Sequence, residues 1–385
     1  MRKFLMGSMI LAVVAASGCS HISVENSARQ NANNADNGVA VKVPVPRFKT
    51  VTDVSHNGSE EYSEALHKET GPLHAVAYSP SLGFLAEKQA LEVPQKAKVK
   101  VGYGSIVQLD SNKELPQPSP ILGYEPDYIE ASKDYICYVY QSSGIGPNVG
   151  ELVYAYNIKT GISTKLWSPA TGTNEQLMEF QLEGDTLYFG VQSSTGDTVK
   201  VEIHQVDLNT MKQKVILISM GSKTDKVVED FAVSGNLIGL IWTPASHFLP
   251  DGGFNASEPY DFTIGPVGGS SKEYIYSGTN ANSFDMRASN GLWTWSDKTN
   301  GVECYSKSSN QLWNVAKYPS YVATDGVCVW WKAVDTPACG GFDTSTQKNL
   351  KLSHINSSFT PIVSNGRIIL SMNENSYFWT TAKHD

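Results

Sequence analysis

Charged side chains and runs of like charge are scarce in this sequence. Asp, Glu, Lys and Arg make up 18% of its 385 residues, against about 25% in a typical soluble domain. No block of five like charges occurs, and 30 basic against 38 acidic residues give 30 − 38 = −8. A nucleic-acid-binding footprint is therefore absent, and no nucleic-acid partner is expected.

Catalytic and metal-binding motifs are missing as well. No Gly-x-Ser-x-Gly nucleophile elbow occurs, and Asp251-Gly252-Gly253-Phe254-Asn255 lacks the alternating oxygens and final Glu of an EF-hand. Four histidines stand isolated from one another: His74, His204, His247 and His354. No catalytic residue, metal or cofactor is predicted from these patterns.

A long hydrophobic run is absent, but a short one opens the chain. The apolar stretch from Phe4 to Ala16 has 13 residues and follows Arg2 and Lys3, whereas a membrane span needs about 20. The small residues 16–18 lead directly into Cys19. This order predicts a signal peptide over residues 1–18.

The small residues before Cys19 resemble the lipobox of bacterial lipoproteins, although Ala16 stands where that family usually has Leu, Val or Ile. The resemblance implies a diacylglycerol thioether on Cys19, cleavage before it, and acylation of the new amine by a chain such as palmitate. More than one acyl chain anchors a protein stably. The expected location is extracytoplasmic, on the cell membrane or on the outer membrane of a host that has one. An ordinary secretory signal is the alternative.

Residues 19–70 are expected to be a flexible polar tether. Asn, Ser, Ala and Asp dominate from Ser20 to Val43, with no periodic apolar face. One short helix is predicted over Ser59 to Glu69. Cleavage of the signal removes two basic residues, so the mature chain carries 28 − 38 = −10, and its acyl chains rather than its charge would hold it to the membrane.

Residues 71–385 contain an internal repeat. Six segments have the pattern strand, tight turn, strand, and the turn holds Asn-Gly, Asp-Gly or a near variant. They begin at Tyr128, Phe180, Phe231, Phe284, Tyr321 and Pro361. Further strand patterns follow at Leu152, Val201, Val302 and Phe342. Units of four strands at spacings of 35 to 56 residues predict an all-β fold, a β-propeller of four-stranded blades.

Six blades account for the repeat, and seven are the alternative. After Gly366 about one more strand fits, while Gly104 to Leu115 has the pattern of an outer strand pair without an inner one. We therefore expect N-terminal outer strands to pair with C-terminal inner strands and close the ring. Seven blades would need strands from residues 74–78 and 83–93, which the six-fold repeat leaves unassigned.

The hairpin followed by a strand ending in Asn157-x-Lys159-Thr160-Gly161 is similar to the TolB-like and quinoprotein-like bacterial propellers. The similarity covers about residues 98 to 383. It implies the architecture and nearly nothing about activity, because propellers serve as binding platforms, lyases, hydrolases and scaffolds.

The number of Cys residues is odd. Cys19 is assigned to the lipid, which leaves four in the propeller. Cys328 and Cys339 fall on adjacent predicted strands of one blade, so they are the candidate disulfide. Two reduced, buried side chains are the alternative.

The predicted ligand-binding face carries the loops between second and third strands and between successive blades, here called the loop face. Its largest element runs from Thr243 to Ser271, and an insertion of this length is often functional. Its candidate residues are His247, Phe248, Tyr260, Asp261 and Phe262. Five charged residues near the starts of innermost strands are candidates for the mouth of the central channel and for ligand contact: Glu130, Glu179, Asp230, Asp285 and Arg287. The alternative is that these charges only hydrate the channel or pair with Arg287.

Together these patterns predict a lipid-anchored, monomeric propeller that binds a protein or an envelope polymer without catalysis. The alternative is a glycan hydrolase or lyase that uses acidic residues at the channel mouth. Retaining glycosidases hold two carboxyl groups about 5 to 5.5 Å apart, and inverting ones about 6.5 to 9.5 Å.

Overall fold

The computed structural model describes residues 45–62, 66–70, 73, 75–88, 104–116, 124–142, 150–249, 259–279, 285–297, 299–318, 320–352, 359–365, 367–372 and 376–380. Apart from one 3-10 turn, η1 (Ala245–Phe248), the regular elements of these residues are β-strands. The predicted signal peptide, Cys19 and the tether as far as residue 44 lie outside the described residues. No helix within the described ranges is long and apolar enough to cross a membrane.

Four blades consist of four consecutive strands each. Blade 1 contains β4 (Ala77–Ser79), β5 (Gly83–Lys88), β6 (Ser105–Gln108) and β7 (Lys113–Glu114). Blade 2 contains β8 (Tyr124–Ala131), β9 (Tyr135–Ser142), β10 (Leu152–Asn157) and β11 (Ile162–Trp167). Blade 3 contains β12 (Gln176–Glu183), β13 (Thr186–Thr195), β14 (Thr198–Asp207) and β15 (Lys212–Ser222). Blade 4 contains β16 (Lys226–Ser234), β17 (Leu237–Pro244), β18 (Pro259–Pro266) and β19 (Glu273–Thr279).

The other three blades also take strands from the N-terminal region. Blade 5 contains β20 (Arg287–Ser289), β21 (Leu292–Asp297), β22 (Gly301–Ser306) and β23 (Gln311–Ala316), with β1 (Thr52–Asp53) added outside. Blade 6 contains β24 (Ser320–Thr324), β25 (Cys328–Ala333), β26 (Cys339–Asp343) and β27 (Lys348–Lys351), with β2 (Ser59–Glu61) added. Blade 7 contains β28 (Thr360–Ser364), β29 (Arg367–Met372), β30 (Ser376–Thr380) and β3 (Leu66–Thr70).

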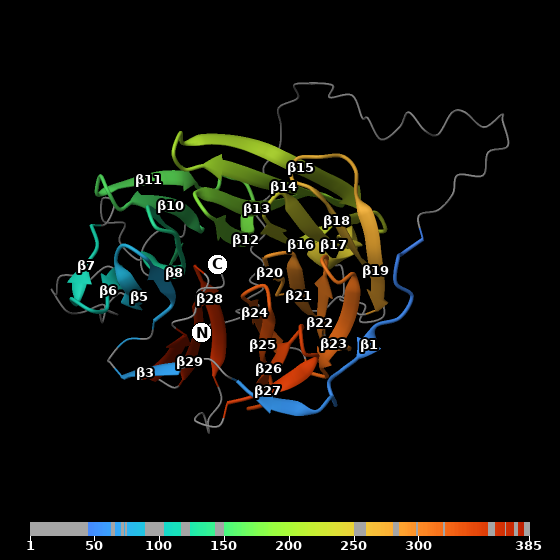
Figure 1. Ribbon diagram of the computed structural model, residues 1–385. Helices are drawn as coiled ribbons and strands as arrows, with labels where there is room; N and C mark the ends of the chain where they lie inside the picture. Colours follow the sequence, from blue (N-terminus) through green and yellow to red (C-terminus); the bar gives the residue numbers. More distant parts are fainter. Residues whose placement is uncertain are drawn as a thin grey trace. The chain divides into compact units, whose positions relative to one another are not determined.

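The innermost strands form a closed ring (Figure 1). They contact one another in the order β4, β8, β12, β16, β20, β24, β28 and back to β4. The all-β propeller of four-stranded blades is confirmed, and the six predicted hairpins are the inner hairpins of blades 2 to 7. The sheets formed by the described residues number seven. The additional blade takes β4 and β5 from the two ranges that the seven-bladed alternative required, and β6 and β7 from residues 104–115, which had been assigned to the closure.

The two ends of the propeller meet in blade 7. Its outermost strand, β3, pairs antiparallel with β30, so one N-terminal strand completes three C-terminal ones. Closure by an N-terminal outer strand was expected, but the strands assigned to it were wrong. Residues 104–115 belong instead to blade 1, because β6 pairs with β5 rather than with the C-terminal hairpin.

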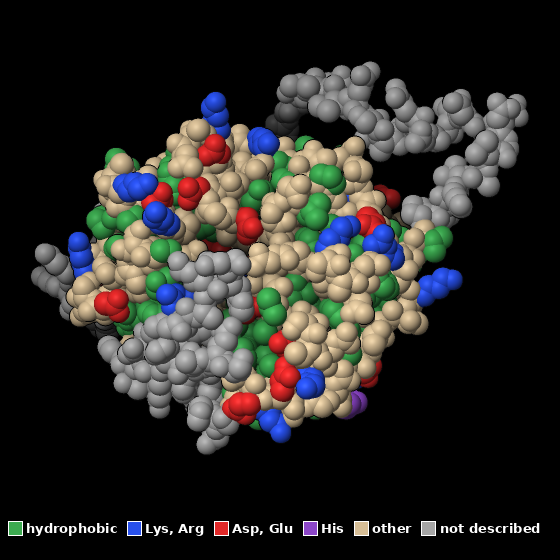
Figure 2. Space-filling view, in the orientation of Figure 1, with side chains coloured by type: hydrophobic (Ala, Val, Ile, Leu, Met, Phe, Trp, Pro, Cys, Tyr) green, Lys and Arg blue, Asp and Glu red, His purple; other side chains and the backbone are tan. Residues whose placement is uncertain are grey.

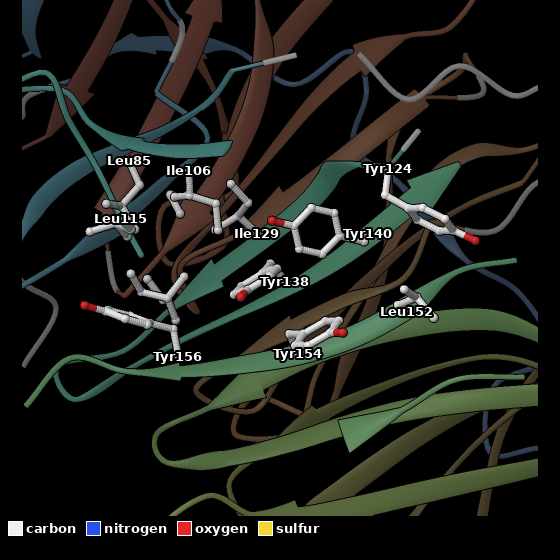
Figure 3. Close-up of a cluster of buried hydrophobic side chains, with 13 residues drawn as sticks. Leu85, Ile106, Leu115, Tyr124, Ile129, Tyr138, Tyr140, Leu152, Tyr154 and Tyr156 are labelled. Atoms are coloured by element: carbon white, nitrogen blue, oxygen red, sulfur yellow. The ribbon is translucent and has the colours of Figure 1, made fainter. Parts of the chain in front are cut away.

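Hydrophobic cores fill the spaces between blades, and seven such clusters follow the ring. Figure 3 shows the cluster between blades 1 and 2, where Leu85 and Ile106 of blade 1 approach Ile129 and Tyr138 of blade 2. The rings of Tyr138 and Tyr154 stack with their centroids 5.7 Å apart. Each blade therefore depends on its neighbours for burial of its apolar faces.

The N-terminal segment runs along the outside of blades 4 to 6 and is here called the belt (residues 45–62). Phe48 forms a parallel bridge with Tyr276 of β19, β1 pairs parallel with β23, and β2 pairs parallel with β27. In Figure 1 the belt is the blue chain beside these outer strands. The prediction of a tether through residue 70 is wrong for residues 45–70, because this part belongs to the propeller unit.

The helix expected over residues 59–69 is also not formed. Residues 59–61 and 66–70 are strands β2 and β3, each hydrogen-bonded to the edge of a blade. The sequence Ser59-Glu60-Glu61 has helix-forming acidic residues, but an open sheet edge offers its main chain partners that an isolated short helix would lack.

Candidate functional site

The five charged residues predicted at the channel mouth do come together. Each lies on an innermost strand or immediately before one: Glu130 on β8, Glu179 on β12, Asp230 on β16, Asp285 just before β20, and Arg287 at its start. The three acids Glu179, Asp230 and Asp285 are buried, and Glu130 and Arg287 are half-buried. Only Asp285 and Arg287 lie at the start of a strand as predicted, because Glu179 and Asp230 are in the middle of their strands and Glu130 is near the end of β8.

Arg287 is the centre of this group. Its Nη1 lies 3.0 Å from Glu179 Oε1, and its Nη2 lies 2.9 Å from Asp285 Oδ1. Nη1 also donates to the main-chain oxygen of Met286 at 2.8 Å, and the guanidinium lies 5.9 Å from the centroid of the Tyr128 ring. One cation thus connects blades 3 and 5 across the ring.

Three of the carboxylates also accept a hydrogen bond from the following blade. Glu130 Oε2 accepts the N–H of Leu182 at 3.0 Å, from blade 2 to blade 3. Asp230 Oδ2 accepts the N–H of Met286 at 3.0 Å, from blade 4 to blade 5. Asp285 Oδ2 accepts the N–H of Val322 at 3.1 Å, from blade 5 to blade 6. These acids satisfy main-chain donors that would otherwise be buried between blades without a partner.

Gln181 performs the same task between blades 3 and 4. Its amide accepts the N–H of Val233 at 2.7 Å and donates to the carbonyl of Val233 at 2.7 Å. A neutral side chain can therefore replace a carboxylate in this position, so the position requires hydrogen bonding and not charge.

Burial changes the protonation of the group. Desolvation raises the pKa of Glu130 from 4.5 to about 7, although the Leu182 N–H and Arg287 lower it. Burial, and after it the charge of Glu179, raise the pKa of Asp230 well above its ordinary value. With Asp230 protonated, Arg287 faces the two carboxylates that it pairs with directly.

Most of the acidic groups at the channel mouth already have partners within the propeller. Three of the four acids accept main-chain N–H groups of the neighbouring blade, and Glu179 pairs with Arg287. Among the described residues, no group of three or more His, Cys, Asp or Glu is arranged to hold a metal ion. Pairing with Arg287 is therefore found for Glu179 and Asp285, whereas Glu130 and Asp230 accept main-chain N–H groups. Contact of these residues with a ligand stays a prediction.

Two predicted loop-face residues are instead in the core. Tyr260 and Phe262 have 0% of their surface exposed, and Phe262 packs on Trp295 with ring centroids 4.4 Å apart. The physical reason is that β18 begins at Pro259, so the alternating apolar residues are the inner face of a strand. Their assignment to a ligand-binding loop was wrong.

Tyr260 joins a buried polar group between blades 4 and 5. Its hydroxyl lies 2.6 Å from Glu303 Oε2 and 3.1 Å from Asp297 Oδ2, and Trp295 Nε1 donates to both the Tyr260 oxygen and Glu303. The Tyr260 hydroxyl has one hydrogen to donate and two carboxyl groups within reach, so a proton on one of the carboxyl groups would supply a second donor. Burial and the nearby Asp297 raise the pKa of Glu303 and favour it as the protonated one.

The remaining loop-face candidates are held by local partners. His247 lies in η1 with its side chain 2% exposed and its Nδ1 3.5 Å from Glu229 Oε2, and Phe248 packs against the core between blades 3 and 4. Asp261 accepts from Lys226 Nζ at 2.5 Å and from the Tyr274 hydroxyl at 2.6 Å. Residues 250–258 of the predicted insertion lie outside the described residues.

The predicted disulfide is not formed. Strands β25 and β26 pair so that Cys339 lies opposite Lys332 and Cys328 opposite Asp343. Cys328 is four residues from Lys332 along β25, which corresponds to about 13 Å and is far beyond the Cα separation that a disulfide tolerates. The two sulfurs are accordingly not bonded to each other.

A second acidic group on the loop face was missed by the sequence analysis. It comprises four half-buried carboxyl groups of blades 1 and 2: Glu87, Glu125, Asp127 and Glu151. Gln141 Nε2 donates to Asp127 Oδ2 at 2.5 Å and lies 3.4 Å from Glu151 Oε1. Burial followed by the charge of Asp127 raises the pKa of Glu87 to about 8, and burial raises that of Glu151 to about 7. Glu87 lies on β5, Glu125 and Asp127 lie on β8, and Glu151 lies just before β10, so no local sequence pattern could have grouped them.

Comparison with known proteins identifies no family for this sequence. No protein-family model matches the sequence, and no curated protein matches it. Many solved structures are similar at low identity, and three of them are described below. The β-propeller domain of the Trilobed protease from Pyrococcus furiosus, described as having an open velcro topology, is 12% identical over 68% of this chain and 83% of its own, with a TM-score of 0.43.

An oligogalacturonate lyase in complex with manganese is 9% identical over 84% of this chain and 96% of its own, with a TM-score of 0.44. A chain of the mitotic checkpoint complex is 12% identical over 91% of this chain and 100% of its own, with a TM-score of 0.47. These similarities carry no conclusion about fold or activity, and the β-propeller is defined by the sheets and the ring of innermost strands.

Proposed function

We propose that this protein is a lipid-anchored, extracytoplasmic β-propeller that binds or scaffolds a protein or cell-envelope component. The signal-like residues 1–18 and Cys19 carry the anchoring part of the proposal, through their resemblance to the bacterial lipobox. The TolB-like pattern around Asn157 to Gly161 agrees with a bacterial envelope location.

The observation that carries the binding role is the use of the channel-mouth carboxylates. Glu130, Asp230 and Asp285 accept main-chain N–H groups from the next blade. A glycosidase or lyase needs carboxyl groups placed against substrate, where they exchange protons or attack. Because these three carboxylates bind main-chain groups between blades, they favour a rigid scaffold over an active site.

The anchoring part is tested with the variant Cys19→Ser in cells of the native host. Labelling with a palmitate analogue and membrane fractionation should show that the wild-type protein is labelled and sediments with membranes, whereas the variant is unlabelled and soluble. A Cys339→Ser variant is the matched control and should behave as the wild type. A labelled, membrane-bound Cys19→Ser protein would overturn the anchoring.

The binding part is tested by treating intact cells with an amine-reactive crosslinker. The wild-type protein should form an adduct of defined higher mass, and the Cys19→Ser variant should form about tenfold less of it, because anchoring raises its local concentration at the envelope. A wild-type protein that stays at its own mass at every crosslinker dose would contradict a binding role.

A further inference from the structure

The outer edge of blade 3 combines length with exposed apolar surface. Strand β15 has 11 residues, and its side chains Val215, Ile218 and Met220 are 41%, 60% and 58% exposed. With Met211 they are four of the eight exposed large hydrophobic residues among those that the structure describes. In Figure 2 hydrophobic side chains on this side of the molecule lie interspersed with acidic and basic ones. A long, apolar edge strand is a template for pairing with another segment.

The next three blades show how such an edge is occupied in this fold. On blades 4, 5 and 6 the belt adds main-chain pairing outside the fourth strand, and each of these pairings is parallel. Blade 3 precedes them in the ring, and β15 is the terminal strand of its sheet in the described part of the chain. Its outward N–H and C=O groups therefore present the same kind of edge that the belt uses elsewhere.

Two ion pairs connect the belt to the blades. Asp53 on β1 pairs with Lys317 at 2.8 Å, and Glu60 on β2 pairs with Lys348 at 3.4 Å. In both cases the added strand supplies the acid and the blade supplies the lysine. Lys212 and Lys214 are exposed at the start of β15, and within the described residues neither forms an ion pair. Lys348 is the first residue of β27, as Lys212 is of β15, whereas Lys317 follows the end of β23. The lysines at the start of β15, of which Lys212 lies opposite Asp207 of β14, thus resemble the blade half of the Glu60–Lys348 contact.

We propose that β15 is the docking edge for an extended segment of a partner protein, which adds to blade 3 as a parallel fifth strand. This inference rests on the proposed binding function and names its surface and its kind of partner. The segment carries a carboxylate near its beginning, opposite Lys212 and Lys214, and then apolar side chains that cover Val215, Ile218 and Met220. Main-chain pairing provides the affinity, and the acid and the apolar positions provide the register.

The test uses the full-length protein in intact cells of the native host, with Ile218 replaced by the photo-crosslinking residue p-benzoylphenylalanine. The matched control places the same residue at Ile162, which is 61% exposed on the outer strand of blade 2. Irradiation should give an adduct at 218 in about tenfold excess over 162. Mass spectrometry of the adduct should identify, in another protein, an acidic residue followed by alternating apolar residues.

Charge reversal supplies the second arm. The double variant Lys212→Glu/Lys214→Glu should lower the yield at 218 about fivefold, whereas Lys165→Glu on the exposed face of β11 should leave it unchanged. The proposal is overturned if the adduct at 218 joins residues 1–44 of this chain, joins a second copy of it, or does not exceed the control at 162. If the amine-reactive crosslinker still gives its adduct in that case, the binding function stands and only its assignment to β15 fails.

Discussion

The mouth of the central channel and the outer edge of β15 use polar groups in opposite ways. At the channel mouth, Glu130, Asp230 and Asp285 bind main-chain donors of the next blade and Arg287 joins two carboxylates. At β15 the outward main-chain groups border exposed apolar side chains. The difference indicates that charge at the centre maintains the ring, whereas the rim is where the molecule can accept another chain.

The largest effect is expected from Arg287→Met. Removal of the guanidinium leaves Glu179 and Asp285 buried without their cation, and breaking a buried pair from one side costs about 3–5 kcal/mol. Urea unfolding should show this loss of stability. Lys226→Met, which breaks the more exposed pair with Asp261, should cost about 1 kcal/mol or less. Equal losses for both variants would mean that the ion pairs of Arg287 contribute no more to stability than the more exposed Lys226–Asp261 pair.

A pH-dependent effect is expected from Glu130→Gln. Because the folded-state pKa of Glu130 is about 7 and its ordinary value is 4.5, the folded protein holds this proton more tightly. The associated stability is complete below pH 4.5 and is lost as the pH rises to 7. Gln keeps an acceptor for the Leu182 N–H but does not titrate. Between pH 4.5 and 7, the free energy of unfolding of the variant should therefore fall by about 2 kcal/mol less than that of the wild type.

The measurement for Glu130 is the free energy of unfolding at several pH values between 4.5 and 7. Glu114→Gln, on the exposed outer strand β7, is the control and should follow the wild-type curve. If Glu130→Gln also follows that curve, the carboxyl group is not held in the protonation state described above.

A smaller effect is expected at the belt. The Asp53–Lys317 pair is about half exposed on both sides, and Lys317 holds the pKa of Asp53 down at about 2. Exposed pairs of this kind contribute about 0.2–1 kcal/mol. Lys317→Met should therefore destabilise the protein by no more than about 1 kcal/mol in thermal unfolding at low salt, and by less at high salt. A loss as large as that for Arg287→Met would place the belt among the elements that hold the ring.

The smallest effect on stability is expected from Ile218→Ser. Its side chain is 60% exposed on β15, and surface substitutions of this kind change stability by about 0.5 kcal/mol or less. The melting temperature should stay within about 2 °C of the wild type. A marked destabilisation would show that Ile218 is packed within the propeller and would remove it from the rim surface.

Much of the blade structure was predictable because its signals are local. The inner hairpins of blades 2 to 7 have turns such as Asn290-Gly291 and Asp325-Gly326, with left-handed φ values at Asn290 (44°), Gly291 (77°) and Gly326 (97°). The hairpin of blade 1 was not assigned, since its turn over residues 80–82 lacks the Asn-Gly or Asp-Gly marker. The belt was missed for a related reason, because strands of two or three residues have no periodicity to detect.

Side-chain partners were predictable only where strand position determined them. The five charges were assigned to innermost strands, and there Arg287 does meet Glu179 and Asp285. Their positions within the strands were less well predicted, since Glu130 lies near the end of β8 and not near its start. The assignment of Tyr260 and Phe262 to a loop overlooked their period-two spacing with Ile264. The pairing of Cys328 with Cys339 depended on the register between β25 and β26, which the length of a hairpin loop sets and residue types do not.

The most direct test of the contrast between centre and rim is hydrogen exchange of the full-length protein, followed by mass spectrometry of its peptides. Residues 212–222 of β15 should exchange faster than residues 311–316 and 348–351, whose strands carry the belt, and the innermost strands should exchange most slowly. Exchange of β15 as slow as that of the belted strands would show that its edge is already occupied and would contradict the account.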